Sequence, residues 1–322
     1  MSKFKVVICD YEFPNVDNER RVLKQLDDVE FIPAQCKTEE EVIELTKDAD
    51  GVINQYSKLN ERVINSMQKC KVISTYGIGV DKIDVQAATK KGIYVCNVPD
   101  YCINEVADHA ITMLLTLSRQ LLAMDRNTKS GMWGYKHVKT PIYRIEGKTV
   151  GVLGFGKIPK NLVKKLQAFD VNILVYDPYV DKETAEKFGV KKVELNELLE
   201  NSDFISIHTP LTPETRHMIG EEQFKKMKPT AYLINVGRGP IVDEKALYKA
   251  LKEGWIAGAA VDVLETEPIS SDNPLLSLEN IIITPHAAWH SLESLAELQT
   301  KAAEEIVRVL KGEKPRSPVN QL

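Results

Sequence analysis

At residues 150–159 the chain reads Val150-Gly151-Val152-Leu153-Gly154-Phe155-Gly156-Lys157-Ile158-Pro159, an apolar strand that runs into a glycine turn. In a dinucleotide-binding fold the first glycine makes the tight turn, the second lets a pyrophosphate approach the backbone, and the third lets the next helix sit close to the strand. Gly154 and Gly156 keep the two phosphate roles, and Pro159 stands in the third position. Because proline in the first turn of a helix forfeits no intrahelical hydrogen bond, we expect the anion site at this helix N-terminus to be intact.

The strand that follows this turn and helix ends on Asp177, at the spacing of about 20 residues that a ribose-binding acid requires. A carboxylate there accepts hydrogen bonds from the ribose hydroxyls and repels a 2′-phosphate. A turn that merely joins a strand to a helix is the simpler alternative, but the strand, the helix and the acid together favour a nucleotide site. The sequence therefore predicts NAD as the cofactor, in preference to NADP.

Short β-branched runs alternate with amphipathic runs along both halves of the chain. Strands are predicted at 4–9, 29–34, 51–55, 71–76 and 93–98, with helices at 20–26, 39–47, 60–67 and 85–91 between them. A longer helix is predicted over 104–126, and strands resume at 149–153, 172–176, 204–207, 231–235, 258–263 and 280–283. This alternation is typical of parallel βαβ units, so we predict two doubly wound α/β domains, with a last helix at 294–310 packing back on the first.

The composition narrows the classes of partner. With 322 residues, 43% of them apolar, and a net charge of -4, the chain can fill two cores and offers no basic field for nucleic acid or anionic membranes. Its five cysteines form no Cys-x-x-Cys pair, which argues against a disulfide framework and against a metal site, and favours the reducing cytoplasm. No signal peptide or transmembrane segment is predicted.

Polar side chains follow the predicted strands of the second domain, where parallel strands end at a common edge and ligands bind. They are Asp177, His208, Asn235, Arg238, Asp262, Glu267 and His286. An arginine can grip a substrate carboxylate, a histidine can protonate a carbonyl as hydride arrives, and an acid can orient that histidine and favour its charged form. Any one of these residues is more often structural, but three at successive strand ends beside a nucleotide turn favour reduction of a 2-keto acid. His109, on the long helix, is interpreted as a packing or surface residue.

Several motifs resemble those of the D-isomer-specific 2-hydroxyacid dehydrogenases. They span nearly the whole chain: Tyr76 to Asp84, Asn104 to His109, the glycine turn, His208 to Thr212, Asn235 to Asp243, Asp262 to Pro268, and Thr284-Pro285-His286. The resemblance implies that Arg238, Glu267 and His286 are catalytic and that Asp262 holds the nicotinamide carboxamide. It also implies homodimers, and a flavodoxin-like substrate domain (1–101 with 291–322) into which a Rossmann NAD-binding domain (102–290) is inserted.

The predicted binding residues complete this hypothesis. For NAD they are Gly154, Gly156, Lys157, Ile158, Asp177, His208, Thr209, Pro210, Val236 and Asp262, and for the substrate Tyr76, Gly77, Ile78, Gly79 and Trp289. The substrate is predicted to be a small 2-keto or D-2-hydroxy acid. Tyr101 to His109 and His286 to Trp289 look most like the branch related to the C-terminal-binding protein corepressors, so an NADH-sensing binding protein is the alternative. Tyr56, Tyr76 and Trp289 would favour an apolar or aromatic side chain on the keto acid. Formate oxidation is disfavoured, because it needs no proton donor.

Overall fold

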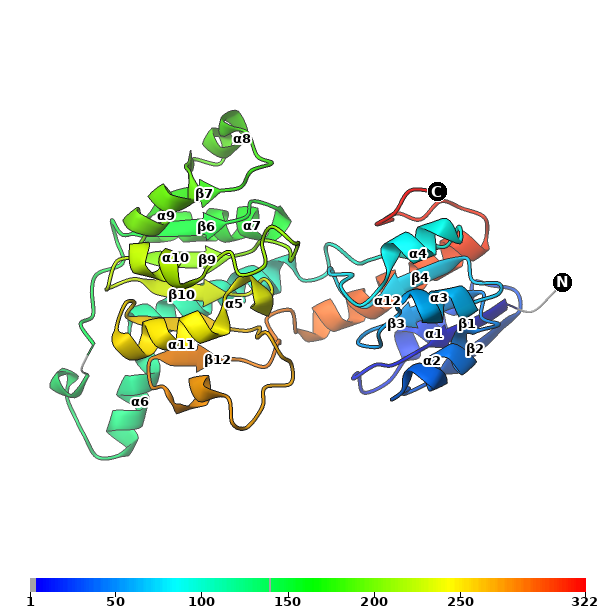
Figure 1. Ribbon diagram of the computed structural model, residues 1–322, viewed down its shortest axis with the longest axis horizontal. Coiled ribbons are helices and arrows are strands. Elements are labelled where there is room, and N and C mark those ends of the chain that lie inside the picture. The colour runs from blue at the N-terminus through cyan, green and yellow to red at the C-terminus, as the bar shows by residue number, and fades with distance from the viewer. Residues whose placement is uncertain (1–3, 139) are drawn as a thin grey trace. The chain divides into compact units, whose positions relative to one another are not determined.

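The computed structural model describes residues 4–138 and 140–322 and divides into two compact units (Figure 1). The first unit comprises Met1–Cys102 and His290–Leu322, and the second comprises Ile103–Trp289. Each unit carries its own parallel sheet with helices on both faces. In the part of the chain that the structure describes, no helix is both long and apolar enough to cross a membrane.

The first unit holds a five-stranded parallel sheet in the order β2-β1-β3-β4-β5. Its strands are β1 (Phe4–Ile8), β2 (Val29–Pro33), β3 (Gly51–Asn54), β4 (Val72–Thr75) and β5 (Tyr94–Cys96), and its helices are α1 (Asp17–Leu23), α2 (Glu39–Thr46), α3 (Glu61–Ser66), α4 (Val85–Lys90) and α12 (Leu292–Leu310). This strand order is the flavodoxin-like one, so the predicted fold of the first domain is confirmed.

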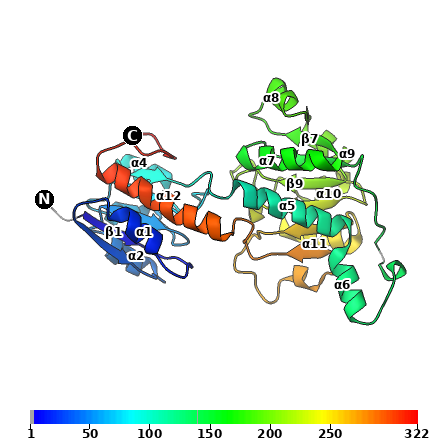
Figure 2. The ribbon, with the colours of Figure 1, turned by 180° about the vertical axis from the view of Figure 1, so that it is seen from behind.

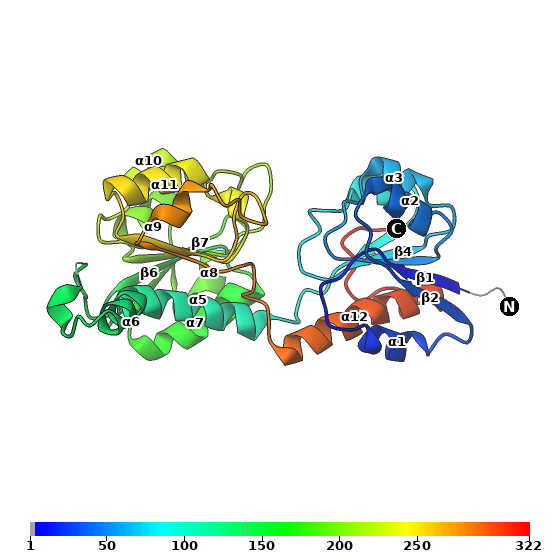
Figure 3. The ribbon, with the colours of Figure 1, turned by 90° about the horizontal axis from the view of Figure 1, so that it is seen from below.

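The helices of the first unit cover its sheet in two layers. Helices α2, α3 and α4 contribute Val42, Ile64 and Ala88 to one core, and α1 and α12 lie together on the other face (Figure 3). Side-chain caps start several of these helices, as where Asn60 accepts a hydrogen bond from the N–H of Val63. The last helix therefore packs on the first sheet, as its place after the second sheet predicts.

The second unit holds a seven-stranded parallel sheet in the order β12-β11-β10-β9-β6-β7-β8. Its strands are β6 (Thr149–Leu153), β7 (Asn172–Tyr176), β8 (Lys191–Lys192), β9 (Phe204–Ile207), β10 (Tyr232–Asn235), β11 (Gly258–Val261) and β12 (Ile281–Ile283). The α-helices are α5 (Ile103–Ser118), α6 (Leu121–Lys129), α7 (Lys157–Leu166), α8 (Lys182–Lys187), α9 (Leu195–Asn201), α10 (Glu221–Lys226) and α11 (Glu244–Glu253). Short 3₁₀ helices lie at η1 (Tyr135–His137), η2 (Gln167–Phe169), η3 (Gly239–Ile241) and η4 (Pro274–Ser277).

The strand order reverses beside β6, which is the Rossmann arrangement and confirms the predicted fold of the second domain. Helices α5 and α7 lie side by side on one face of the sheet (Figure 2), and α9, α10 and α11 cover the other face. Strands such as β9 and β10 are buried along their whole length, which explains their continuous apolar sequence.

Three details of this unit bear on what the sequence predicts. The single long helix predicted over 104–126 is wrong, because Gln120 adopts a left-handed backbone with φ of 51° and separates α5 from α6. The two-residue strand β8 consists of lysines and carries no apolar signal. Pro159 is the third residue of α7 and is buried, so the helix begins at the glycine turn despite the missing glycine, as predicted.

Candidate active site

The glycine turn after β6 lies against the turn after β9. Gly154 has a φ of +88°, and a Cβ there would lie 3.1 Å from the carbonyl carbon of His208 and from the amide nitrogen of Thr209. The turn therefore needs glycine for both its backbone angle and its close approach. Gly156 then caps α7, and a Cβ placed on it would meet no atom within 4 Å. The space above the helix N-terminus is open, and Lys157 and Ile158 form the first residues of α7.

Asp177 ties the end of β7 to this turn. Its Oδ2 accepts a hydrogen bond from the N–H of Phe155 at 2.7 Å, and its Oδ1 accepts one from the N–H of Tyr179 at 2.8 Å. Each oxygen keeps a second lone pair, so the carboxylate can still accept from ribose hydroxyls.

The residues of the turn after β9 differ in their exposure to solvent. Pro210 is exposed, whereas Thr209 is buried and its Oγ1 has no hydrogen-bond partner among the residues that the structure describes. An unpaired buried hydroxyl beside an open helix N-terminus fits a polar ligand such as the pyrophosphate of NAD. This donor set, with Asp177 beyond it and Val236 half-buried after β10, fits the predicted cofactor.

His208 is placed for packing and hydrogen bonding. Its Nε2 lies 2.8 Å from the Oγ of Ser206, and burial lowers the pKa of the imidazole to about 3. The ring is therefore neutral at physiological pH. It can line a cofactor pocket, but it cannot act as a general acid.

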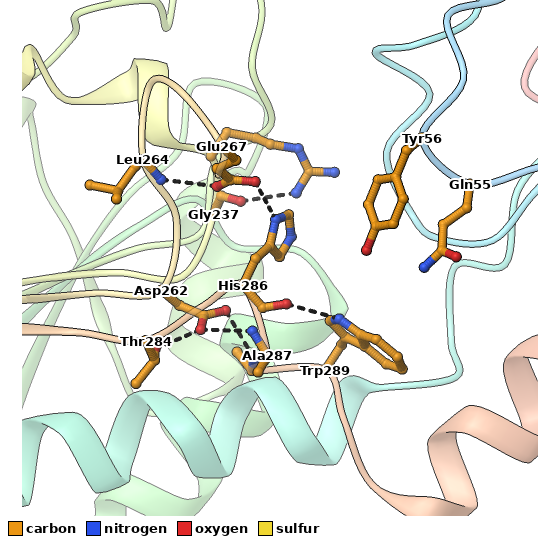
Figure 4. A network of polar contacts seen from close by, with 12 residues as sticks. Gln55, Tyr56, Gly237, Asp262, Leu264, Glu267, Thr284, His286, Ala287 and Trp289 are labelled. Carbon is orange, nitrogen blue, oxygen red and sulfur yellow. Dashed lines mark hydrogen bonds and ion pairs between the residues drawn. The ribbon is translucent and has the colours of Figure 1, made fainter. Parts of the chain in front are cut away.

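Glu267 and His286 form a hydrogen-bonded pair in the loops that follow strands β11 and β12 of the second sheet (Figure 4). The Nδ1 of His286 lies 2.7 Å from the Oε2 of Glu267, and the Oε1 of Glu267 accepts a hydrogen bond from the N–H of Leu264 at 3.0 Å. Burial alone would raise the pKa of Glu267, but the hydrogen bond and charge of His286, the Leu264 amide and the charge of Arg238 outweigh it and lower the pKa. The carboxylate stays ionised beside the imidazole, and Nε2 is left for chemistry.

Arg238 reaches this pair because two loops touch. A Cβ on Gly239 would lie 1.9 Å from the carbonyl oxygen of Leu264, so only glycine lets the loop after β10 contact the loop after β11. Arg238 caps the 3₁₀ helix η3, and its Nη1 donates to the carbonyl of Gly237 at 2.9 Å. The three residues predicted to be catalytic therefore lie on neighbouring loops, after β10, β11 and β12.

The backbone of His286 is held in an uncommon conformation. Its φ is 53°, a left-handed value that few residues other than glycine adopt. The N–H of His286 donates to the carbonyl of Asp262 at 2.8 Å, and the Asp262 carboxylate accepts the N–H groups of Ala287 and Ala288, both at 2.9 Å. The Nε1 of Trp289 donates to the carbonyl of His286 at 3.0 Å. Such strain persists at functional sites only where the surroundings impose it.

Sequence reasoning missed two residues that support this turn. Thr284 donates from Oγ1 to the Oδ1 of Asp262 at 2.6 Å, and His109 on α5 lies with Nε2 3.1 Å from that same Oγ1. The interpretation of His109 as a packing or surface residue therefore overlooked a polar role. No local signal marks it, because its partner lies 175 residues away in sequence.

In the Tyr76–Gly79 stretch of the first unit, the tyrosine ring is buried and the groups that a ligand could contact belong to the backbone. The ring is 6% exposed, and its hydroxyl donates to the Oε1 of Glu19 at 2.5 Å. The expectation that the Tyr76 side chain lines the substrate site needs correction: the ring is held inside the unit by Glu19. The carbonyls of Gly77 and Ile78 accept from the N–H of Val98 at 2.9 Å and from the Nδ2 of Asn97 at 2.7 Å.

The amides of this loop remain available to a ligand. Within residues 4–138 and 140–322, the N–H groups of Ile78 and Gly79 make no recorded hydrogen bond. A loop with its carbonyls engaged and successive N–H groups open is an anion-binding arrangement. It suits the carboxylate of a keto acid.

Comparison with known proteins identifies a family and several similar chains. Residues 111–288 match the model of a family described as D-isomer specific 2-hydroxyacid dehydrogenase, NAD binding domain. The chain is similar to a D-3-phosphoglycerate dehydrogenase of Methanocaldococcus jannaschii, at 44% identity over 98% of this chain and 59% of that protein. It is also similar to a glyoxylate reductase of Korarchaeum cryptofilum, at 42% identity over 87% of this chain and 85% of that protein. The chain thus spans little more than half of the first relative and most of the second.

A solved structure has a similar fold over nearly the whole chain. The crystal structure of D-lactate dehydrogenase from Aquifex aeolicus, complexed with NAD and lactic acid, matches with a TM-score of 0.85 and 31% identity. The match covers 96% of each chain. The similarity therefore extends over both units and is not confined to the glycine turn.

Proposed function

The chain belongs to the D-isomer specific 2-hydroxyacid dehydrogenase family, whose cofactor is NAD, and from that premise we propose that it reduces a small 2-keto acid to the D-2-hydroxy acid. In this reaction NADH and a proton are consumed, and NAD and the hydroxy acid are formed. NADH, when bound, supplies the hydride that reaches C2 of the keto acid. The remaining requirements are a grip on the substrate carboxylate and a proton for the developing alkoxide, and this chain offers residues for both.

The proton donor in this proposal is Nε2 of His286. Glu267 accepts the Nδ1 hydrogen, so the imidazole keeps its orientation while Nε2 gives its proton to the carbonyl oxygen. Arg238 would hold the substrate carboxylate and polarise the adjacent carbonyl. In the first unit, the open amides of Ile78 and Gly79 are proposed to bind a keto acid carboxylate. The single observation that carries the proposal is the 2.7 Å contact between His286 and Glu267.

The proposed cofactor site consists of the glycine turn, the start of α7, Asp177, the turn after β9, Val236 and Asp262. The carboxylate of Asp177 supports NADH over NADPH, because it would face a 2′-phosphate with like charge. The expected role of Asp262 in holding the carboxamide remains a proposal. Its Oδ1 already accepts from Thr284 and Ala287 and its Oδ2 from Ala288, all in the loop after β12, so any such contact uses the remaining lone pair of Oδ2.

The proposed substrate class is a 2-keto acid with a small uncharged side chain. Relatives named glyoxylate reductase support it, as in Korarchaeum cryptofilum. The case for a large aromatic side chain loses one of its supports, since the Tyr76 ring is turned toward Glu19, while the Tyr56 ring remains 52% exposed. The test is kcat/KM for glyoxylate, pyruvate, phenylpyruvate and 3-phosphohydroxypyruvate. The highest value on the phosphate-bearing acid would contradict this class.

The corepressor-like alternative gains no support from the three relatives reported above, which are all named as dehydrogenases or reductases. It also leaves the paired His286 and Glu267 without a purpose. Tight NADH binding without turnover on any keto acid of the panel would restore it.

We also propose a homodimer that works in the cytoplasm. All five cysteines are free thiols, which suits a reducing compartment. Large apolar side chains are exposed on α6 and the segment after it, including Leu121 and Leu122 at 55%, Trp133 at 84% and Tyr135 at 87%. An exposed group of this kind supports burial against a second copy. Analytical ultracentrifugation of wild type and Leu122→Lys tests it, and a monomeric wild type would contradict it.

A further inference from the structure

Glu19 is a buried carboxyl that the proposed reaction does not use. It lies on α1, its side chain is fully buried, and it forms no ion pair within the described part of the chain. Burial raises the pKa of this carboxyl, although hydrogen bonds from Tyr76 and Gln299 pull it down. A buried carboxyl without a cation is costly, so its hydrogen-bond partners indicate what holds it there.

Its two oxygens connect three separate elements of the first unit. The hydroxyl of Tyr76, at the end of β4, donates to Oε1 at 2.5 Å. The Nε2 of Gln299, on α12, donates to Oε2 at 3.1 Å and to the carbonyl of Asn15 at 2.8 Å. Tyr76 also packs edge to face on Phe13, with ring centroids 4.9 Å apart. Two donors fix the carboxyl, and the carboxyl in turn fixes the rotamer of Tyr76.

Tyr76 is the residue before the loop proposed to bind the substrate carboxylate. Its backbone N–H donates to the carbonyl of Asn54 at 2.8 Å, so both ends of the residue are held. The N–H of Gly77 donates back to the carbonyl of Thr75 at 3.0 Å, and the carbonyls of Gly77 and Ile78 accept from Val98 and Asn97. Gly77 has a φ of 157°, which residues other than glycine rarely adopt, and its hydrogen bond to Thr75 makes Tyr76 the central residue of a tight turn at the start of the loop. The direction of the Ile78 and Gly79 amides therefore depends on how firmly Tyr76 is placed.

We propose that Glu19 is a positioning residue that sets the Gly77–Gly79 loop for substrate binding by holding the hydroxyl of Tyr76 and linking it to Gln299 of α12. This inference rests on the proposed function, because it assigns the loop to the keto acid carboxylate. It assigns no chemistry to Glu19 itself. It also explains why a phenol stands at a buried position where phenylalanine would pack equally well.

Three variants and one control test the proposal. Tyr76→Phe removes one hydroxyl, Glu19→Ala removes the carboxyl, and Glu19→Gln keeps an acceptor for Tyr76. Thr46→Val is the matched control, because Thr46 is a fully buried hydroxyl of the same unit that bonds only within its own helix, to the carbonyl of Val42 at 2.8 Å. Each protein is measured for Tm, for kcat and KM, and for hydrogen exchange of the amides of Tyr76, Gly77 and Val98, which are hydrogen-bonded to the carbonyls of Asn54, Thr75 and Gly77.

Tyr76→Phe and Glu19→Ala are expected to raise KM for the keto acid by about tenfold with kcat and the KM for NADH nearly unchanged, since uniform binding is lost. Hydrogen exchange of the Tyr76, Gly77 and Val98 amides should accelerate in both, Glu19→Gln should recover most of the loss, and Thr46→Val should alter Tm alone. Unchanged exchange of these three amides in both variants would overturn the positioning role, whatever happens to Tm. Absence of keto acid turnover in the wild type would instead overturn the proposed function, and exchange would still decide on Glu19.

Discussion

Oε2 of Glu267 lies 2.7 Å from Nδ1 of His286, and its other oxygen is held by the amide of Leu264 at 3.0 Å. The acid therefore cannot turn away from the imidazole without losing a backbone hydrogen bond. The proposed acid-base role of His286 needs an imidazole held in a fixed orientation, and this pair of contacts provides one.

Replacement of Glu267 by Gln should lower kcat by about 10- to 100-fold, because an amide has one acceptor oxygen for the two donors, Nδ1 of His286 and the N–H of Leu264, and carries no negative charge beside the ring. The KM for NADH should stay within about twofold, since the pair does not touch the proposed cofactor turn. Steady-state kinetics check both numbers. A Gln variant as fast as wild type would remove the acid from the mechanism.

The same pair predicts a pH dependence of stability. The pKa of Glu267 in the folded protein is below the ordinary value of 4.5. Its contribution to the free energy of unfolding is therefore complete above pH 4.5 and is lost as the pH falls through the lowered folded value. Urea unfolding of wild type and Glu267→Gln should show a difference that shrinks only below pH 4.5. A difference that is already shrinking between pH 7 and 5 would contradict the shift.

His208 should not titrate in the physiological range, because burial holds its pKa at about 3 instead of 6.5. Below pH 6.5 the unfolded chain takes up a proton that the folded chain refuses, so this residue costs stability progressively as the pH falls from 6.5 toward 3. NMR of the His208 ring protons should show no inflection above pH 5. An inflection near 6.5 would show that the ring is solvated.

Trp289 is predicted to act through the backbone of His286. Trp289→Phe keeps an aromatic ring but removes the Nε1 donor that holds the carbonyl of His286 at 3.0 Å. The left-handed turn should loosen, and kcat should fall about tenfold with a smaller change in the KM of the keto acid. A change confined to KM would instead mean that the indole contacts the substrate and leaves the turn unaffected.

Asp177 should set the choice of nicotinamide cofactor. In Asp177→Asn the side chain keeps an acceptor for one of the two amides it now binds, from Phe155 and Tyr179, but loses its charge. We expect the wild type to bind NADH more tightly than NADPH. In Asp177→Asn the Kd for NADPH, divided by the Kd for NADH, should fall at least about tenfold. Fluorescence titration measures both constants. A wild type that binds NADPH as tightly as NADH would refute the role of the charge.

Much of this architecture could be predicted because its signals are local. Parallel strands buried on both faces need continuous apolar runs, and β9 and β10 have them. The glycine turn needs a positive φ at Gly154, which the sequence supplies. Pro159 was compatible with the helix start because its missing N–H falls in the first turn, where no intrahelical acceptor exists.

The remaining features depend on contacts that no local pattern reports. Gln120 breaks the long helix although the leucines after it continue a helical sequence, and both are left 55% exposed. His109 finds Thr284 across 175 residues. Tyr76 stands beside the substrate loop in sequence, but its side chain is directed to Glu19 on another element. In each case tertiary packing decides the outcome.

The most direct test of the account is NADH oxidation with a 2-keto acid by wild type, His286→Ala and His217→Ala. His217 is a matched control, since it shares the left-handed φ of 53° and lies 3.3 Å from a carboxylate of Glu265, outside the proposed site. We predict saturable turnover in wild type and in His217→Ala, a loss of at least about a hundredfold in kcat for His286→Ala, and similar NADH affinity in all three. Equal turnover by His286→Ala and wild type would contradict the central claim.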